Sequence, residues 1–364
     1  MSRPADISTP LDWVAASSQE IIEVAPTGEE KKAMGNAFFR GHNCNFNPYG
    51  PDHRKDNFCE HFILKGNMPA QKIINKETQV TAFGSCFAKN ITEHLSSLGF
   101  STSKQRAPGI YISAMGEGLV NVHSLLQQFE WALTNVRPPE NLWHGFDAKE
   151  FGYDEDVRQE TRRIFLTTDV FIITLGLSEI WFDEKTGGIF WRAVPMKSYD
   201  PGRHKFRVCS FAETKEAIFK IYRLIRSEVP RAKIIFTLSP IPLVATFRNQ
   251  ACIVANAASK AILRAALDEF MRDDPHAADP DLHYFPAYEI VNELFPVRFL
   301  YDGRHPHPSI VPAVMKIFEA HFCETALTRA EAEASLKLAR KMSADLCAED
   351  IRLQAPPASA GVNA

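Results

Sequence analysis

Three side chains of this sequence could together form a catalytic centre: the hydroxyl of Ser85, the imidazole of His305 and the carboxylate of Asp302. A serine hydroxyl is a weak nucleophile until a base takes its proton, and a carboxylate can orient and stabilise that base. Asp302 and His305 are three residues apart, so a helical or tight turn directs both side chains the same way. Taken singly, Asp302 could cap a helix and His305 could be a surface histidine. The three together favour a catalytic triad.

Ser85 follows a short apolar run at 80–83 and precedes residues with helical spacing at 91, 95 and 98. The pattern predicts a strand, a sharp turn at Gly84 and a helix. Two roles are open for the serine in that place. Its hydroxyl can cap the helix, or it can act as a nucleophile beside N–H groups that hold an oxyanion.

Two further apolar, β-branched runs, at 169–175 and 233–238, are typical of strands buried on both faces. Strands that alternate with helices predict an α/β fold, doubly wound on a mainly parallel sheet. Ligands of such folds bind beyond the carboxyl ends of the strands. Four polar clusters follow predicted strands directly: Gly84-Ser85, Gly176 to Glu179, Ser239-Pro240 and Pro286 to Glu289. We therefore expect one active site at this edge.

The other elements follow from periodicity and turn residues. We expect a hairpin over 182–194, turning at Thr186-Gly187-Gly188. The further expected elements are a glycine-rich loop over 106–121, helices over 121–133, 210–229, 250–271, 312–322 and 329–349, and a strand over 282–285. The predicted domains are an N-terminal extension packed on the main domain (1–75), the main domain (76–325), and a C-terminal helix with a disordered tail after 354 (326–364).

Composition excludes several classes of protein. A net charge of −3 gives no electrostatic case for nucleic acid or an anionic membrane. No apolar run approaches the roughly 20 residues that span a bilayer, and the N-terminus lacks the apolar core of a secretory signal. We therefore expect a cytoplasmic protein. The seven scattered cysteines suit reduced thiols rather than disulfides.

The pentapeptide Gly84-Ser85-Cys86-Phe87-Ala88 resembles the signature of the GSCFA-domain family, a branch of the SGNH (GDSL-like) hydrolase superfamily. The resemblance continues in family order from Thr81 to Phe322, through GEGLVN, QQFEWAL, TLGLSEIW, TLSPIP, YFPAYE and DGRHP. It implies a three-layer α/β/α, flavodoxin-like fold. Several ordered motifs are far more specific than one pentapeptide.

The resemblance implies that Ser85 is the nucleophile and that Asp302 and His305 are the last-block acid and base. The segment Gly176 to Glu179 matches the superfamily's Gly-x-Asn-Asp block, but Ser178 replaces the asparagine that donates to the oxyanion. Several groups therefore remain candidates for the donors of the oxyanion hole: Ser178, the Ser85 N–H, and backbone near Gly116 or Gly118. The expected cleft residues are Gly176, Glu179, Tyr288 and Glu289.

The superfamily implies ester chemistry, either hydrolysis or O-acyl transfer to a sugar hydroxyl, through the same acyl-enzyme. We expect a small-molecule or carbohydrate ester as substrate and no cofactor, with acyl-CoA a possible donor. The oligomeric state is open. The main alternative is a carbohydrate-binding or assembly module that keeps the fold without turnover. Another is a cysteine enzyme that uses Cys86, activated at a helix start.

Three remaining groups have a functional and a structural interpretation. Trp131 and Trp181 could stack on a sugar, although core packing is more common. The basic residues at 203–207 could meet a phosphate of CoA or a nucleotide sugar, although a solvated loop is the default. The histidines and cysteines between 42 and 61 match no common metal-binding spacing, so we expect no metal.

Overall fold

The structure is a computed structural model that describes residues 20–24, 30–34, 45, 47–48, 50–115, 118–139, 142–145 and 148–354. The chain divides into two compact units, residues 1–55 and 56–364. The first unit contains an antiparallel pair, β1 (Glu20–Val24) and β2 (Glu30–Met34), in which Glu20 lies opposite Met34. The 3₁₀ turn η1 (Gly50–Arg54) follows them in the same unit.

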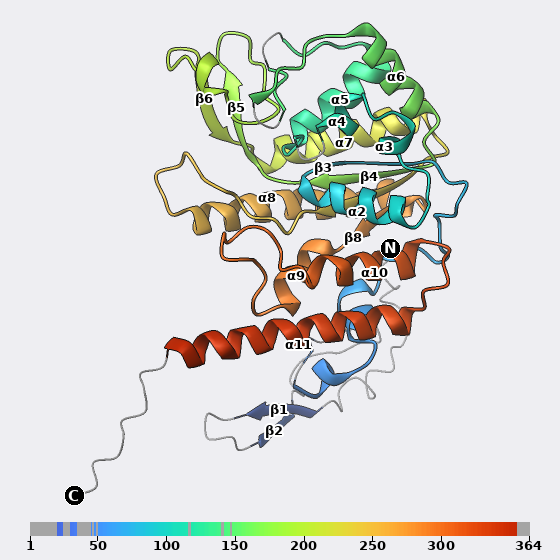
Figure 1. Ribbon diagram of the computed structural model, residues 1–364, viewed down its shortest axis with the longest axis vertical. Coiled ribbons are helices and arrows are strands. Elements are labelled where there is room, and N and C mark those ends of the chain that lie inside the picture. Colours follow the sequence, from blue (N-terminus) through green and yellow to red (C-terminus); the bar gives the residue numbers. More distant parts are fainter. Residues whose placement is uncertain are drawn as a thin grey trace, which may run out of the picture. The chain divides into compact units, whose positions relative to one another are not determined.

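The second unit is built on a parallel sheet (Figure 1). Its strands, in the order β3-β4-β7-β8, are β3 (Val80–Gly84), β4 (Val170–Leu175), β7 (Lys233–Leu238) and β8 (Leu282–Phe285). β-Branched and aromatic residues fill these strands, and nearly all of them are buried, as expected for strands covered on both faces. The prediction of a mainly parallel sheet is confirmed. Because the strands are parallel, their carboxyl ends lie at the same edge of the sheet.

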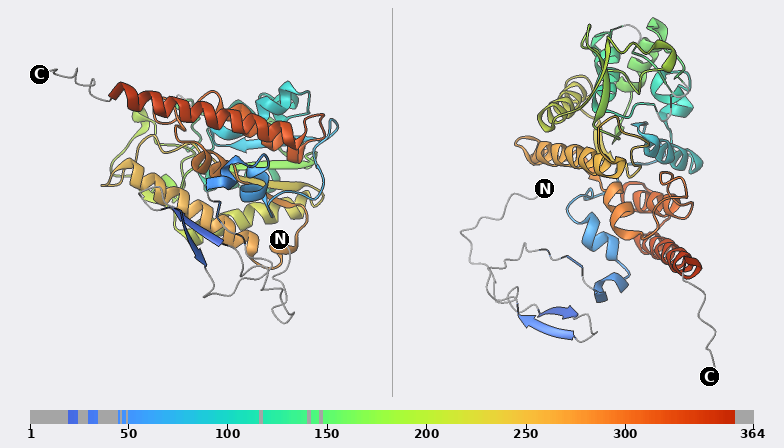
Figure 2. Two further views of the ribbon diagram at one scale, coloured as in Figure 1. Left: turned by 90° about the horizontal axis from the view of Figure 1, so that it is seen from below. Right: turned by 90° about the vertical axis from the view of Figure 1, so that its left-hand side faces the viewer.

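Helices cover both faces, which confirms the three-layer α/β/α architecture. On one face, Ile173 and Phe236 pack with α5 (Val122–Thr134), α6 (Glu155–Leu166), α7 (Phe211–Glu228) and α8 (Cys252–Arg272). On the other, Ile172 and Ile235 pack with α2 (Cys86–Ser97), α9 (Ala287–Leu294) and α10 (Ile310–Phe322). The helix α11 (Arg329–Gln354) runs along α10 (Figures 1 and 2).

The expected hairpin over 182–194 is only partly right. The chain does turn there, because the Asp183 N–H donates to the Gly188 carbonyl at 2.8 Å. However, the longer partner of β5 (Glu179–Asp183) is β6 (His204–Val208), in an antiparallel ladder that brings Trp181 opposite Phe206. Their rings are 5.7 Å apart, and such cross-strand aromatic pairs stabilise a register. A local turn pattern could not reveal that distant partner.

Short elements connect the larger ones: α3 (Ser103–Arg106), α4 (Tyr111–Ala114), the π turn η2 (Glu60–Leu64), and the 3₁₀ turns η4 (Met196–Ser198) and η5 (His276–Ala278). Residues 56–75 belong to the same compact unit as α10 and α11. The N–H groups of Ile73 and Ile74 both donate to the Phe322 carbonyl. Within the described part of the chain, no helix is long and apolar enough to cross a membrane.

Candidate active site

Ser85 lies at the turn between β3 and α2, where the sequence predicts it. It is the N-cap residue of α2, and its Oγ accepts a long 3.4 Å hydrogen bond from the Phe87 N–H. The side chain is almost fully buried, with 4% exposed. The Ser85 N–H donates to the Thr174 carbonyl at 3.2 Å, as part of the β3–β4 pairing. Ser85 therefore makes the capping contact, and its own N–H already has an acceptor.

Two glycines bring strand ends close together beside Ser85. Gly84 has φ +135°, and a Cβ there would lie 2.2 Å from the Thr174 carbonyl oxygen. A Cβ on Gly176 would lie 2.4 Å from the Val120 carbonyl oxygen and 3.3 Å from the Ser85 Cβ. Only glycine allows these approaches. The backbone of Gly176 thus forms a wall of the site directly against Ser85.

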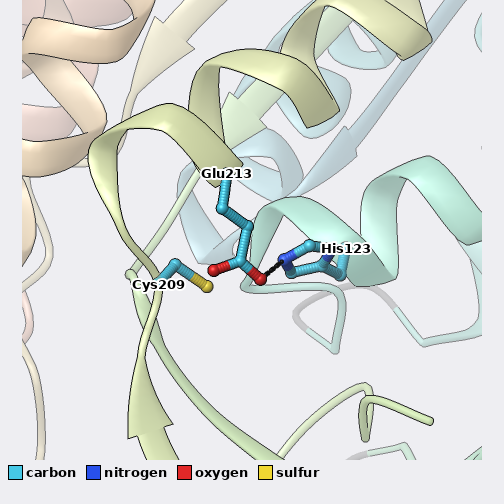
Figure 3. A group of neighbouring side chains, drawn as sticks. All are labelled: His123, Cys209 and Glu213. Carbon is cyan, nitrogen blue, oxygen red and sulfur yellow. Dashed lines mark ion pairs between the residues drawn. The ribbon is translucent and has the colours of Figure 1, made fainter. Parts of the chain in front are cut away.

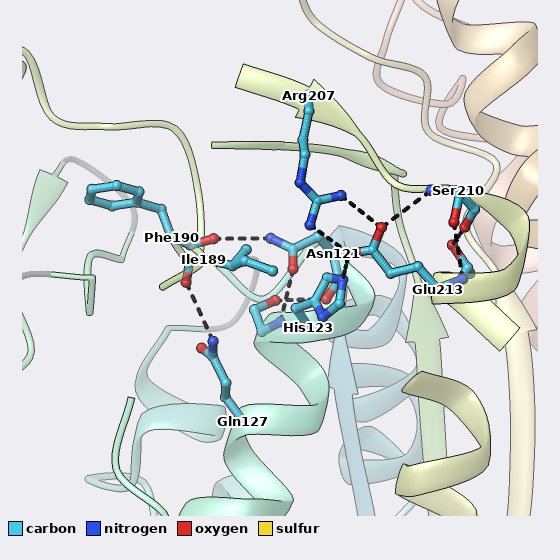
Figure 4. A network of polar contacts seen from close by, with 10 residues as sticks. Asn121, His123, Gln127, Ile189, Phe190, Arg207, Ser210 and Glu213 are labelled. Carbon is cyan, nitrogen blue, oxygen red and sulfur yellow. Dashed lines mark hydrogen bonds and ion pairs between the residues drawn. The ribbon is translucent and has the colours of Figure 1, made fainter. Parts of the chain in front are cut away.

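The loop before α5 also reaches this wall. The Leu177 N–H donates to the Val120 carbonyl at 2.9 Å. Asn121 anchors the loop: its amide nitrogen donates to the Phe190 carbonyl at 3.1 Å, and its Oδ1 caps α5 (Figure 4). Gly118 lies two residues before Val120, and its oxyanion role stays a prediction. Gly116 lies outside the described residues.

Asp302 and His305 form the tight turn that their spacing predicts. Asp302 Oδ2 lies 2.5 Å from His305 Nδ1, and its Oδ1 accepts the N–H groups of Arg304 and His305. These bonds lower the pKa of Asp302 to about 2, the contact with His305 contributing most. Gly303, at φ +67°, allows the turn. Since Nδ1 faces the carboxylate, Nε2 is left to exchange a proton.

The loop that carries this pair lies beside the start of α2. Arg304 Nη2 reaches Cys86 Sγ at 4.0 Å, and Cys86 directly follows Ser85. Among the described residues, no hydrogen bond joins Ser85 Oγ to His305. Asp302 and His305 are both solvent-exposed at the rim, whereas Ser85 is buried. The pairing of Ser85 with His305 therefore stays a prediction.

Ser178 and Glu179 face parts of the chain other than Ser85. The hydroxyl of Ser178 donates to Ser259 Oγ on α8 at 3.1 Å, and the Ser178 N–H bonds the same oxygen at 2.8 Å. The Thr246 hydroxyl donates to Glu179 Oε1 at 2.9 Å. Burial raises the pKa of the Glu179 carboxyl, against the effects of Thr246 and Arg248. The oxyanion role of Ser178 stays a prediction, and it requires the hydroxyl to leave Ser259.

Tyr288 and Glu289 lie in the first turn of α9, just after the edge strand β8. Glu289 is held between two partners, because Arg264 Nε donates to Oε1 and the Tyr284 hydroxyl donates to Oε2, both at 2.7 Å. Tyr288 is half-buried against the core, and burial raises its pKa. The contacts of Glu289 join β8, α8 and α9, so they fit a structural role. Their place in a substrate cleft stays a prediction.

Lys260, on α8, is a residue that the sequence interpretation missed. Its side chain is 2% exposed, and Nζ donates to the Gly176 carbonyl at 2.7 Å and to the Ser239 carbonyl at 2.8 Å. Burial lowers the pKa of Lys260 to about 7, partly offset by Cys86. A signal did exist: Lys260 stands three and seven residues before Leu263 and Leu267, on the apolar stripe of the helix.

A second polar cluster lies on the face covered by α5 and α7. His123, Cys209 and Glu213 place their ligand atoms within 4.8 Å of one another (Figure 3). These are ligand types that zinc accepts. However, both oxygens of Glu213 receive the guanidinium of Arg207, at 2.6 and 2.7 Å (Figure 4). Burial raises the pKa of Cys209 to about 12. An internal ion pair therefore accounts for the cluster.

The basic residues at 203–207 are paired with carboxylates. Arg203 binds Asp183 through two hydrogen bonds, and Lys205 lies 3.9 Å from Glu184. These contacts favour the structural interpretation over a phosphate site. His42 and Cys44, from the group considered for metal, lie outside the described residues.

The two tryptophans considered for sugar stacking differ in setting. Trp131 is fully buried in the core, stacked on Tyr111. Trp181 is half-buried on β5, and its ring meets those of Tyr199 and Phe247 edge to face. Phe247 is one residue from Thr246, the partner of Glu179. Only Trp181 therefore belongs to an aromatic group near the predicted cleft.

A search of curated proteins found no match. Three similar solved structures are a carbohydrate esterase family 2 enzyme with a carbohydrate binding domain from Corynascus thermopiles (Myceliophthora fergusii), a carbohydrate esterase family 3 from Talaromyces cellulolyticus, and an acetyl xylan esterase from Butyrivibrio proteoclasticus. Their identities are 12%, 12% and 10%, and their TM-scores are 0.30, 0.28 and 0.29. The alignments cover 79%, 75% and 76% of this chain, and 70%, 99% and 66% of the others.

TM-scores this low add nothing to the fold described above. The family comparison is different in kind, because it matches the sequence itself. The model of the GSCFA family matches residues 79–318, which is most of the chain and contains Ser85, Asp302 and His305. The chain therefore belongs to the GSCFA family.

Proposed function

We propose that this protein is a serine-dependent enzyme that hydrolyses or transfers an acyl ester through an acyl-enzyme on Ser85. One observation carries the proposal. The Asp302–His305 turn lies beside the β3–α2 turn that bears Ser85, and the contact of Arg304 with Cys86 joins the two segments. This proximity of the two segments supports the proposal that His305, oriented by Asp302, acts as the base for Ser85.

The reaction would begin when His305 Nε2 takes the proton of the Ser85 hydroxyl. The oxygen then attacks the ester carbonyl, and the tetrahedral intermediate carries the negative charge. His305 returns the proton to the leaving alcohol, which leaves an acyl-serine. Water then releases the acid, or an acceptor hydroxyl takes the acyl group. Asp302 holds Nδ1 and stabilises the imidazolium that forms.

The favoured substrate class is a carbohydrate ester or glycan precursor. The aromatic group around Trp181 supports this class, because rings beside polar groups suit a sugar. The proposal leaves open whether water or a sugar hydroxyl resolves the acyl-enzyme, and an acyl-CoA could be the donor. Intact-protein mass spectrometry after mixing with acetyl-CoA, and then with a panel of sugars, distinguishes hydrolysis from acyl transfer. Loss of the acyl group from the protein on addition of one sugar supports transfer, whereas loss to water alone supports hydrolysis.

A second candidate nucleophile is the thiol of Cys86. It is the first residue of α2, where the helix dipole favours a thiolate, and Arg304 is 4.0 Å away. Burial does not separate the two candidates, because the exposed fraction is 9% for Cys86 and 4% for Ser85. We favour the serine because it occupies the nucleophile position implied by the resemblance of Gly84-Ser85-Cys86-Phe87-Ala88 to the GSCFA signature.

A fluorophosphonate probe tests the proposal, because it labels serines that a neighbouring base activates. We expect labelling of the wild-type protein at Ser85 and none of Ser85→Ala. Cys86→Ala is the matched control, since it alters the adjacent residue and should still be labelled. An unlabelled wild-type protein that also turns over no ester would support the alternative of a binding module.

A further inference from the structure

Lys260 is an unusual residue for the place where it lies. Lysine is almost never fully buried unless it is paired, since removing an ammonium from water is costly. Lys260 is 2% exposed, yet no carboxylate in the described part of the chain forms an ion pair with it. Its hydrogen bonds go to two backbone carbonyls, those of Gly176 and Ser239. Such a buried cation needs an explanation.

The two carbonyls are those that directly follow β4 and β7. Gly176 comes after Leu175 and Ser239 comes after Leu238, so both lie at the carboxyl edge of the sheet. The lysine therefore links the carboxyl ends of the two central strands through these hydrogen bonds. Without its N–H groups, both buried carbonyls would lose these hydrogen bonds, which folded proteins rarely tolerate.

One of these carbonyls belongs to the wall against Ser85. A Cβ on Gly176 would come within 3.3 Å of the Ser85 Cβ, and the next N–H, of Leu177, is bound by the Val120 carbonyl. The Gly176 peptide is thus fixed from both sides, by Lys260 through its oxygen and by the loop before α5. Any movement of that peptide would change the space in which a substrate meets Ser85.

We propose that Lys260 is a positioning residue of the acyl-transfer centre: by donating to the Gly176 carbonyl it fixes the Gly176 peptide behind Ser85. The inference rests on the proposed function. A shift of the wall against which the reacting groups are aligned disturbs the reacting geometry more than the binding of the substrate. Loosening the Gly176 peptide should therefore lower kcat more than it raises KM.

A purely structural role for Lys260 leads to a different expected result. It would stabilise the fold, and its loss would lower the melting temperature without changing the rate per folded molecule. Lys260→Met keeps an unbranched side chain, one atom shorter than lysine, and removes the charge and the donors. Lys260→Gln keeps N–H donors one atom nearer the backbone and has no charge. Leu267→Ala is the control, because Leu267 is fully buried on the same helix, two turns further on.

The experiment measures kcat and KM for a nitrophenyl ester, together with thermal unfolding, for the three full-length variants. For Lys260→Met we expect a kcat at least about tenfold lower with KM within about twofold. Leu267→Ala should lose comparable thermal stability and keep its kcat, and Lys260→Gln should recover part of the loss. A folded Lys260→Met with wild-type kcat would overturn the inference, as would an equal kcat loss in Leu267→Ala. If Lys260→Met does not fold, Lys260→Gln decides by the same criterion.

Failure of the proposed function is distinguishable from failure of this inference. If the wild-type protein neither turns over an ester nor takes the probe, the proposed function fails. The positioning of the strand ends is then read by amide hydrogen exchange at Leu177 and Ser239, whose N–H groups bond Val120 and Leu175. Faster exchange at these two amides in Lys260→Met than in Leu267→Ala supports the positioning. Equal exchange in the two variants refutes it.

Discussion

The guanidinium of Arg304 contacts the sulfur of Cys86, with Nη2 and Sγ 4.0 Å apart. This contact spans 218 residues of sequence, and it joins the segment of the candidate base to the segment of the candidate nucleophile. The site is therefore assembled by packing between the loop before α10 and the start of α2. Its proposed chemistry depends on side chains from both.

Ser85→Ala should lower ester turnover about a thousandfold or more, because the proposed nucleophile is lost. The variant also loses the cap of α2, which costs about 1 kcal/mol, so it should fold with a slightly lower melting temperature. Nitrophenyl acetate hydrolysis and circular dichroism measure the two effects. Unchanged turnover by purified Ser85→Ala would refute the assignment.

The matched variant for that experiment is Cys86→Ala. It changes the neighbouring residue and leaves the serine in place, so most activity should remain. A complete loss of turnover in folded Cys86→Ala, with Ser85→Ala active, would identify the thiol as nucleophile instead.

His305→Asn should remove most activity together with the acid limb of the rate profile, because a protonated imidazole cannot act as base. With its pKa lowered to about 2, Asp302 stays ionised above about pH 4, so it cannot cause that limb. His307→Asn should keep both the activity and the acid limb of the rate profile. The reason is that His307 Nδ1 contacts the Ser309 hydroxyl at 2.8 Å rather than an acid. If the two variants behave the other way round, the base is His307.

Gly84→Ala should destabilise the protein by more than about 2 kcal/mol. The new Cβ would lie 2.2 Å from the Thr174 carbonyl oxygen, and φ is +135°. Gly152→Ala is the control, because nothing lies within 4 Å of a Cβ there. That change should be neutral or slightly stabilising. Urea unfolding measures both, and equal stabilities of the two variants would contradict the geometry.

Acid should weaken the fold through two buried histidines. Burial lowers the pKa of His283 and of His321 to about 4, from an ordinary value of 6.5. Between these values the unfolded chain binds protons that the native state does not, so stability falls as the pH falls. Each histidine contributes at most about 1.4 kcal/mol per pH unit.

Urea unfolding at pH 4.5, 5.5 and 6.5 checks this slope. Replacing each histidine with glutamine should flatten the dependence, because the group that takes up the proton is gone. A stability independent of pH over this range would show that the two buried rings are not the sites that bind protons on unfolding.

Much of the fold could be predicted because its signals are local. The β-branched runs at 170–175 and 233–238 could only be buried strands, and the turn at Gly84 followed from glycine between a strand and a helix. The Asp302–His305 pair was predictable for the same reason, since three residues and a glycine determine it. The pairing of β5 with β6 was not, because residues some 25 apart must meet.

The candidate site was predictable only in part. The candidate nucleophile, acid and base follow from motif and spacing, whereas their relative placement depends on contacts between distant segments. The bond of Ser178 to Ser259 and that of Lys260 to Gly176 both depend on how α8 packs. No local pattern in an alanine-rich helix predicts which strand end that helix will contact.

The last long helix, α11, cannot be deleted without loss of buried contacts. Glu333 on α11 accepts the N–H groups of Cys59 and Glu60, at 3.2 and 2.6 Å, and Leu336 and Ala339 are buried beside it. A chain shortened at residue 326 would leave those two N–H groups without this acceptor and expose apolar surface on α10. We expect such a chain to aggregate on expression, whereas one that ends at 354 should stay monodisperse. Any shortened version made for crystallisation should therefore keep α11.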